Sequence, residues 1–175
     1  MKKQIEFTNK EQVKVCRKKI IENIDKANLS IKKINESTKG FEFIRQIKFE
    51  KSSLDTLFDE PINFIEQINQ TCTYLVCLAA VEILLSEHPQ HRFIVNFGVA
   101  PGYDILSEDK TIICECFAVT APDSNGKLKR DVEKVNNAMC KHKYVIFYAS
   151  NPKPTTVENI RSKYLDVKII ALNNI

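Results

Sequence analysis

The 175-residue sequence predicts an α/β fold preceded by a long N-terminal helix. Apolar residues recur at helical spacing through the first forty residues, and from residue 61 onward the pattern indicates helix, three strands, helix, strand, helix, strand. Three consecutive strands argue against a doubly wound nucleotide-binding sheet, in which helix and strand alternate, and residues 98–102 contain no phosphate-binding fingerprint. We therefore expect residues 1–60 to form a basic N-terminal helix and connector, and residues 61–175 to form the α/β core.

Composition indicates an ordered protein whose cysteines are reduced. Hydrophobic residues make up 43% of the chain and charged residues 27%, with few Gly and Pro, which argues against wholesale disorder. The six cysteines include no Cys-x-x-Cys pair, so we interpret them as reduced and mostly buried thiols. The N-terminus contains no uninterrupted apolar segment of signal-peptide or membrane-spanning length. We expect a soluble, cytoplasmic protein.

The positive charge is unevenly distributed. The formal net charge is +4, and residues 1–60 contain 14 Lys and Arg against 10 Asp and Glu, whereas residues 61–175 contain 12 of each kind. The first third thus supplies the whole excess. A basic arm on a neutral core is compatible with binding a phosphate backbone, and equally with a solvated lysine-rich helix.

The first predicted helix runs to about Thr38, with Thr8 or Asn9 as its cap and Gly40 as its stop. Its apolar residues form one stripe at spacings of three and four: Val13, Cys16, Ile20, Ile24, Ala27, Ile31 and Ile34. This stripe requires a partner, either the second helix or the same helix of another subunit. A homodimer through the N-terminal helix therefore remains open.

Residues 41–60 contain a short β-like piece at 43–49, which we interpret as a connector or an edge strand. Pro61 is suited to the first position of a second helix that continues to about Glu87. Residues 71–85 of this helix are apolar almost all round, which predicts burial against a sheet. Glu82 is the single charge in that stretch, and it either faces solvent or turns toward the same site as Asp104 and Glu115.

The remaining elements follow in alternating patterns. We expect strands at residues 92–97, 103–106 and 111–120, a helix at 127–139, a strand at 144–149, a helix at 155–164 and a last strand at 167–172. The inner stripe of the first of these helices comprises Leu128, Val132, Val135 and Met139. His88 and His91 flank Pro89 in a predicted surface loop, and His142 carries no special signal.

Residues 102–117 predict a hairpin that carries two acids on one face. The polar stretch 107–110 is a turn signal between two β-favouring runs. With a turn of two or four residues, Asp104 faces Ile113, and Glu115 lies two positions further along the same face. Alternation assigns the second strand's residues to two faces: Ile113, Glu115, Phe117 and Val119 on one, and Ile112, Cys114, Cys116 and Ala118 on the other.

A carboxylate among isoleucines and cysteines needs a partner from elsewhere, because this run contains no positive charge. A second carboxylate on the same face makes a divalent metal the natural candidate. Sites rich in oxygen suit Mg²⁺ or Mn²⁺, which use one or two carboxylates together with waters and a substrate phosphate. The purely structural alternatives are that Asp104 caps a turn and that Glu115 pairs with Lys127 or Arg92.

The order of elements in residues 61–150, together with Gly102-Tyr103-Asp104 and Ile113-Cys114-Glu115-Cys116-Phe117, resembles the PD-(D/E)xK nuclease superfamily of restriction endonucleases and Holliday-junction resolvases. The resemblance implies a restriction-endonuclease-like αβββαβ core with a central mixed sheet flanked by helices. It implies that Asp104 and Glu115 bind Mg²⁺, with Glu82 completing the acidic cluster. The expected function is Mg²⁺-dependent endonucleolytic hydrolysis of double-stranded DNA by a dimer.

The chain departs from the superfamily at one position. The superfamily's Lys stands two residues after the Glu, where this chain has Phe117, which carries no charge and no hydrogen-bonding group. The lysine's role has moved to a residue near the start of the next helix, or the module has lost its chemistry and binds nucleic acid or a protein partner, or the hairpin match is coincidental. The candidate replacements are Lys127, Lys129, Arg130 and Lys134.

Overall fold

The computed structural model describes residues 3–98 and 100–175, and divides into two compact units. The first unit comprises the N-terminal residues up to Lys10 together with Thr73–Ile175, and the second comprises Glu11–Cys72. Helix α3 (Phe64–Glu87) contributes its first turns to the second unit and the rest to the first.

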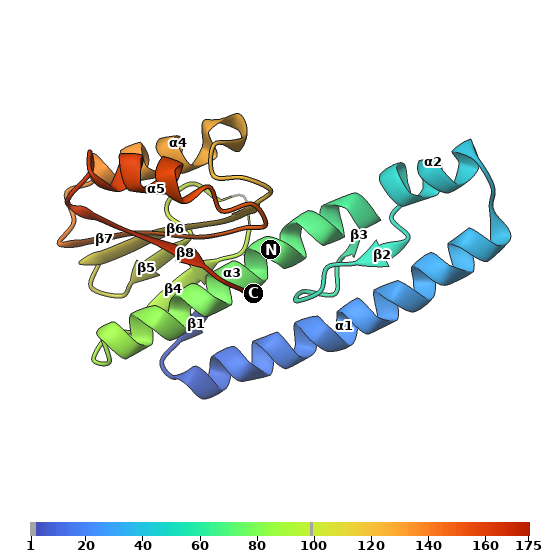
Figure 1. The fold of residues 1–175 in the computed structure, drawn as a ribbon. Coiled ribbons are helices and arrows are strands. Elements are labelled where there is room, and N and C mark those ends of the chain that lie inside the picture. Colours follow the sequence, from blue (N-terminus) through green and yellow to red (C-terminus); the bar gives the residue numbers. More distant parts are fainter. Residues whose placement is uncertain (1–2, 99) are drawn as a thin grey trace. The chain divides into compact units, whose positions relative to one another are not determined.

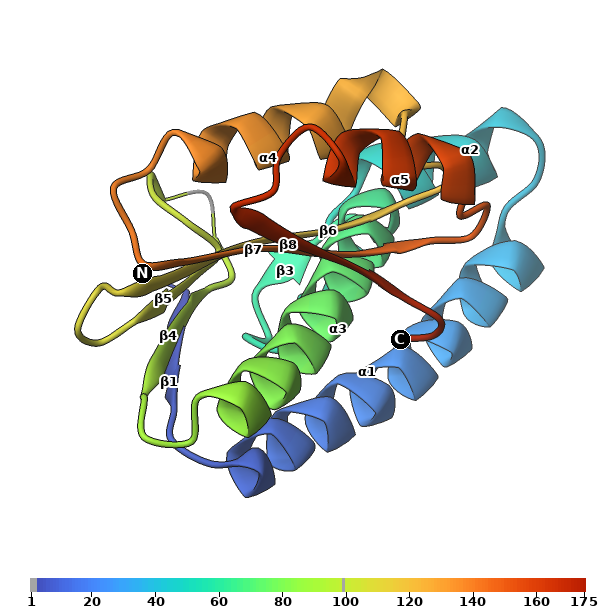
Figure 2. The same ribbon diagram turned by 60° about the vertical axis from the view of Figure 1, so that its left-hand side comes forward.

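The first unit is built on a six-stranded mixed sheet, in the order β1-β4-β5-β6-β7-β8. The strands are β1 (Gln4–Phe7), β4 (Phe93–Asn96), β5 (Ile105–Ser107), β6 (Ile112–Val119), β7 (His142–Ala149) and β8 (Val167–Leu172). The pairings from β1 to β6 are antiparallel, and β6, β7 and β8 are parallel. Helices α4 (Lys127–Asn136) and α5 (Pro154–Arg161) cover one face, and α3 lies on the other (Figures 1 and 2). The predicted α/β class is thereby confirmed.

The alternation predicted for β6 is confirmed. Ile113 and Phe117 belong to the buried cluster that packs against α4 and α5, in which Leu128, Val132 and Val135 are the inward residues of α4. Met139 of the predicted inner stripe lies beyond the end of α4 and is exposed, so that part of the prediction is wrong. The opposite side of β6 carries two buried thiols, Cys114 and Cys116, whose sulfur atoms lie 3.6 Å apart. Burial raises the pKa of Cys114 and of Cys116. The hydrogen bond between Cys77 of α3 and Cys116, together with burial, raises the pKa of Cys77, so the three thiols stay protonated.

Strand β1 was not expected from the sequence. It pairs antiparallel with β4, with Ile5 opposite Val95 and Phe7 opposite Phe93. Phe7 is fully buried. Residues 4–7 are therefore part of the core sheet, although the sequence predicted only a helix and connector before residue 61.

The register predicted for the hairpin is wrong by two residues. Ile105 faces Cys114 and Leu106 faces Ile113, because β5 extends through Ser107 and the turn occupies residues 108–111. The buried Ser107 hydroxyl donates to Asp109 Oδ1 (2.6 Å) and accepts from the backbone N–H of Ile112 (3.0 Å). These bonds hold Ser107 in the strand and move the turn one residue further along. A shift of two preserves which residues share a face.

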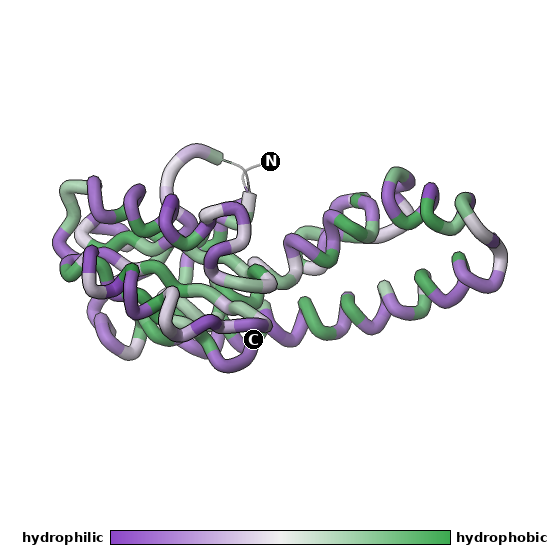
Figure 3. The backbone as a smooth tube through the Cα atoms, turned by 45° about the horizontal axis from the view of Figure 1, so that its top comes forward, coloured by the Kyte–Doolittle hydropathy of each residue, from purple (hydrophilic) through white to green (hydrophobic). Residues whose placement is uncertain are grey.

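The second unit begins with α1 (Lys10–Ser37), as predicted, and hydrophilic and hydrophobic stretches alternate along it (Figure 3). Val13, Ile20 and Ala27 of the predicted stripe are buried. The buried Asn23 side chain donates to the Thr56 carbonyl oxygen (3.0 Å) and to Asp59 Oδ1 (3.1 Å). These bonds connect α1 to the segment that joins β2 (Ser53–Leu54) to β3 (Pro61–Ile62).

Two expectations in this unit are corrected. Residues 43–49 are not a strand but belong to helix α2 (Phe41–Phe49), which follows Gly40 (φ 57°) and has no buried residue. Without a neighbouring strand to pair with, the segment satisfies its backbone internally. Pro61 lies in β3, and α3 instead starts after Asn63, whose side chain accepts a hydrogen bond from the backbone N–H of Glu66 (2.8 Å).

The three histidines gather at one corner of the first unit, although the sequence predicted unremarkable positions. The His88 ring lies 4.8 Å from His142 and 5.7 Å from His91 between centroids, and its Nε2 lies 2.7 Å from the Tyr144 hydroxyl. Tyr144 in turn donates to Glu87 (2.9 Å) at the end of α3.

Among the described helices, α3 is the one long and apolar enough to cross a membrane by length and composition, and half of its most apolar stretch is buried.

Candidate active site

Two carboxylates face each other at the β5–β6 pairing. Asp104 directly precedes β5, and Glu115 lies in the middle of β6, opposite Asp104 when the register of Ile105 and Cys114 is continued by one residue. Asp104 Oδ2 accepts a hydrogen bond from the backbone N–H of Cys116 (2.7 Å). Glu115 is only 4% exposed. The two acids thus meet on the face of the sheet that α4 covers.

Lys134 of α4 supplies the cation at this site. Its Nζ donates to Glu115 Oε1 (2.6 Å) and to the carbonyl oxygen of Gly102 (2.6 Å), and it lies 5.2 Å from the centre of the Tyr103 ring. The Lys134 ammonium therefore connects Glu115 to the segment that carries Asp104. Of the four replacements considered for the missing lysine, Lys134 is the one that contacts Glu115.

A second charge pair on α4 lies beside the first. Lys127 Nζ is 2.9 Å from each carboxylate oxygen of Asp131, but only Oδ1 has hydrogen-bond geometry. The buried Oδ2 has no hydrogen-bond partner among the described residues. The same ammonium lies 5.5 Å from the centre of the Phe117 ring, which stacks on Phe147 with centroids 5.1 Å apart. Phe117 is therefore a core residue whose ring also forms a cation–π contact with the Lys127 ammonium.

Burial dominates the electrostatics of the three acids. It raises the pKa of Glu115 to about 7, with a further increase from the negative charge of Asp104, against the opposing effect of Lys134. The pKa values of Asp104 and Asp131 are also raised, first by burial, and are lowered in part by the Cys116 N–H and by Lys127 respectively. The pKa of Glu115 therefore lies near neutral pH, and a bound cation would favour the ionised acids.

The other predicted residues lie further from this centre. Lys129 is 67% exposed and pairs with Glu133 (3.8 Å). Arg130 donates to the Asn125 carbonyl oxygen. Glu82 is partly buried on α3, the helix on the opposite face of the sheet from α4. The structure thus brings Asp104, Glu115 and Lys134 together and does not place Lys129 with them.

The donor set suits one kind of metal better than others. In the described part of the chain, no group of three or more His, Cys, Asp and Glu side chains is arranged to hold a metal ion. Two carboxylates that face each other still match Mg²⁺, which is commonly held by one or two carboxylates and completes its shell with waters and substrate phosphate. Asp104 and Glu115 would hold it, and no third protein ligand is implied.

Asp131 is the residue that sequence reasoning missed. It is 5% exposed and interacts electrostatically with both Asp104 and Glu115. The signal was present, because Asp131 immediately precedes Val132 of the inner stripe of α4 and therefore borders the buried face. An acid at that border, four residues after Lys127, indicates a buried ion pair.

Comparison with protein-family models, curated proteins and solved structures finds no match to this chain.

Proposed function

We propose that the protein is a Mg²⁺-dependent endonuclease that hydrolyses DNA phosphodiester bonds, of the restriction-endonuclease type and with a variant third motif. The observation that carries the proposal is the contact of Lys134 with Glu115 (2.6 Å), at a buried carboxylate that faces Asp104. This arrangement restores an acid–acid–cation constellation in which α4 supplies the cation. The helix–three strands–helix–strand order of α3, β4, β5, β6, α4 and β7 also supports it.

Each residue has a distinct role in this proposal. Asp104 and Glu115 would hold a Mg²⁺ ion, and the Cys116 N–H keeps Asp104 in place. Such an ion would supply Lewis-acid chemistry, namely a lower pKa for a coordinated water and neutralisation of charge on the phosphate. Lys134 leaves Glu115 for the attacking water or a phosphate oxygen, as its partly exposed side chain allows. The Lys127–Asp131 pair holds the second cation next to this position.

Double-stranded DNA is the proposed substrate. The charge excess in residues 1–60 supports backbone binding by α1 and its flanks. Cleavage of both strands usually requires two sites, so we also propose a homodimer formed through α1.

The proposal is tested by cleavage of plasmid and oligonucleotide duplexes with Mg²⁺ or Mn²⁺. Asp104→Asn, Glu115→Gln and Lys134→Met should each reduce the rate at least about a hundredfold, because each removes a metal ligand or the positioned cation. Lys129→Met removes an equal charge from the same helix away from the acids, and should cut like the wild type. Wild-type cleavage by Glu115→Gln would show that the assignment is wrong.

A catalytically inactive nuclease-fold module that binds nucleic acid or a protein partner is the second candidate. It is favoured by the partners that the acids already have, namely Lys134 for Glu115, the Cys116 N–H for Asp104 and Lys127 for Asp131. This candidate predicts no cleavage by the wild type and no increase in Tm with Mn²⁺. An increase in Tm that Asp104→Asn abolishes would instead favour the nuclease.

A further inference from the structure

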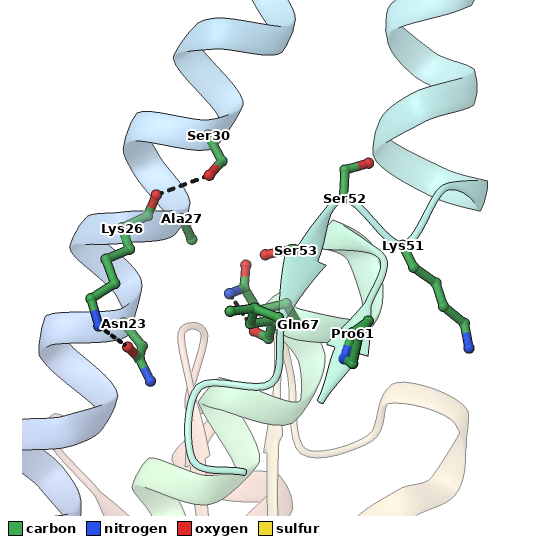
Figure 4. Close-up of a pocket in the computed structure, with 10 residues that line it drawn as sticks. Asn23, Lys26, Ala27, Ser30, Lys51, Ser52, Ser53, Pro61 and Gln67 are labelled. Atoms are coloured by element: carbon green, nitrogen blue, oxygen red, sulfur yellow. Dashed lines mark hydrogen bonds between the residues drawn. The ribbon is translucent and has the colours of Figure 1, made fainter. Parts of the chain in front are cut away.

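The second unit contains a solvent-open cavity of about 360 Å³, bordered by α1, residues 51–54, β3 and the first turns of α3 (Figure 4). Ten residues line it: Asn23, Lys26, Ala27, Ser30, Lys51, Ser52, Ser53, Leu54, Pro61 and Gln67. This lining contains two lysines and three serines, and no acid. Its sequence segments are separate from the acid site on β6, so the two sites share no residue.

Several hydrogen-bond donors of the lining are unused. Ser53 is only 7% exposed, its hydroxyl forms no hydrogen bond with the described residues, and Figure 4 shows that hydroxyl on the side of α1. Ser52 has only two long contacts, at 3.4 and 3.5 Å, to backbone carbonyl oxygens. The Ser53 oxygen is not enclosed by the fold, so water or a bound molecule in the open cavity can accept its hydrogen bond.

The two lysines have spare capacity as well. Lys26 makes one hydrogen bond, to Asn23 Oδ1 (2.9 Å), which leaves two of its three donors free. Lys51 has no hydrogen bond or ion pair within the described part of the chain. Its ammonium turns outward in Figure 4, at the end of a flexible four-carbon stem.

The amides of the lining are engaged in the fold. Asn23 donates to Thr56 and Asp59, and Gln67 donates to the Leu54 carbonyl oxygen (2.7 Å). They fix the walls. Ser30 is engaged too, because its hydroxyl donates to the Lys26 carbonyl oxygen (3.2 Å), so the two lysines, Ser52 and Ser53 remain available. Ala27, Leu54 and Pro61 add apolar surface. The cavity therefore combines a cationic, donor-rich part with an apolar flank.

We propose that this cavity binds a small molecule that carries a phosphomonoester. Such a group has a charge of about −1.5 to −2 at neutral pH and three acceptor oxygens, which matches two ammonium groups and the hydroxyls. The cavity equals about a dozen water volumes at ~30 Å³ each, which suits a mononucleotide-sized ligand rather than a polymer.

The test is a titration of the ¹⁵N-labelled full-length chain followed by NMR. Adenosine 5′-monophosphate should shift the amides of Ser52, Ser53 and Leu54, inorganic phosphate should shift the same amides at higher concentration, and adenosine should not. Lys51→Gln should weaken nucleotide binding about tenfold or more, and Ser53→Ala about fivefold, because each removes a donor to a charged group. Lys48→Gln makes the same charge change three residues away, outside the lining, and should bind like the wild type.

The proposal is overturned if adenosine produces the same shifts as the nucleotide, or if Lys51→Gln binds no more weakly than Lys48→Gln. It is also overturned if a single-stranded oligonucleotide binds these amides more tightly than the mononucleotide, since a polymer would then be the ligand. The DNA cleavage variants lie in the other unit, so failure of one proposal leaves the other intact.

Discussion

At the scale of residues, the site depends on how a buried carboxylate finds its counter-charge. Glu115 is enclosed by the core, and the strand that carries it offers no cation within reach. The positive charge comes from Lys134 of α4, the helix that follows β6 in the chain. This helix packs on the face of the sheet that carries Glu115. Phe117 packs in the core instead. A lysine at its buried position would place a charge away from solvent, whereas the Lys134 side chain is partly exposed.

The first prediction concerns the pH dependence of stability. The folded-state pKa of Glu115 is about 7 against an ordinary value of 4.5, so the folded state binds the extra proton between these values. The bound proton on Glu115 therefore stabilises the folded state. This stabilisation is fully present below pH 4.5 and is lost as the pH rises through 7. Glu115→Gln should remove this loss, which is on the order of 3 kcal/mol at most.

The measurement is urea unfolding of both proteins at several pH values between 4 and 8. The difference in unfolding free energy, variant minus wild type, should rise over this range. Glu108→Gln, an exposed carboxylate on the hairpin turn, is the matched control and should show no such rise. A difference that stays constant with pH would show that Glu115 titrates normally.

Some of these residues could be predicted and some could not. The shared face of Asp104 and Glu115 was predictable, because a two-residue error in register leaves the alternation of side chains unchanged. The choice of Lys134 over Lys127 and Lys129 was not, because it depends on how α4 is placed over the sheet. The sequence therefore identifies the acids better than the cation.

At the scale of elements, prediction succeeded where the sequence pattern is clear and failed where a few hydrogen bonds determine the structure. Strand β8 matches its expected limits, and α1 differs from them by one or two residues. Strand β1 is four residues long, too short for a pattern, and it is ordered by pairing with β4. Helix α2 contains many β-favouring residues, and a helical conformation satisfies its backbone without a neighbouring strand.

The start of α3 gives a prediction at this scale. Asn63 caps the first turn through the Glu66 N–H, so Asn63→Ala should lower the unfolding free energy by about 1 kcal/mol. Asn63→Asp retains an acceptor oxygen and should stay close to the wild type. Urea midpoints of the three proteins measure the effect. Equal midpoints for Asn63→Ala and wild type would indicate that the cap contributes nothing.

At the scale of the whole molecule, the N-terminal segment has two separate roles. Residues up to Lys10 belong to the unit that carries the sheet, while α1 from Glu11 onward belongs to the other unit. Deleting the first forty residues would therefore remove β1 along with α1 and expose the backbone edge of β4. A loss of assembly after such a deletion would not distinguish an interface on α1 from a damaged sheet, so substitutions on α1 are the better test.

The proposed dimer through α1 leads to the last prediction. Val15 and Leu29 lie fourteen residues apart on one side of α1, and they are 70% and 63% exposed. The wild type should have twice the 20.1 kDa chain mass by light scattering, and Val15→Glu with Leu29→Glu should have the mass of one chain, because two charges would be buried in the interface. Met139→Glu with Leu165→Glu changes two exposed apolar residues of the other unit, and should leave the dimer intact. A monomeric wild type, or a dimer that survives both charges on α1, would show that this helix does not join two copies, and DNA cleavage would then have to proceed from single sites.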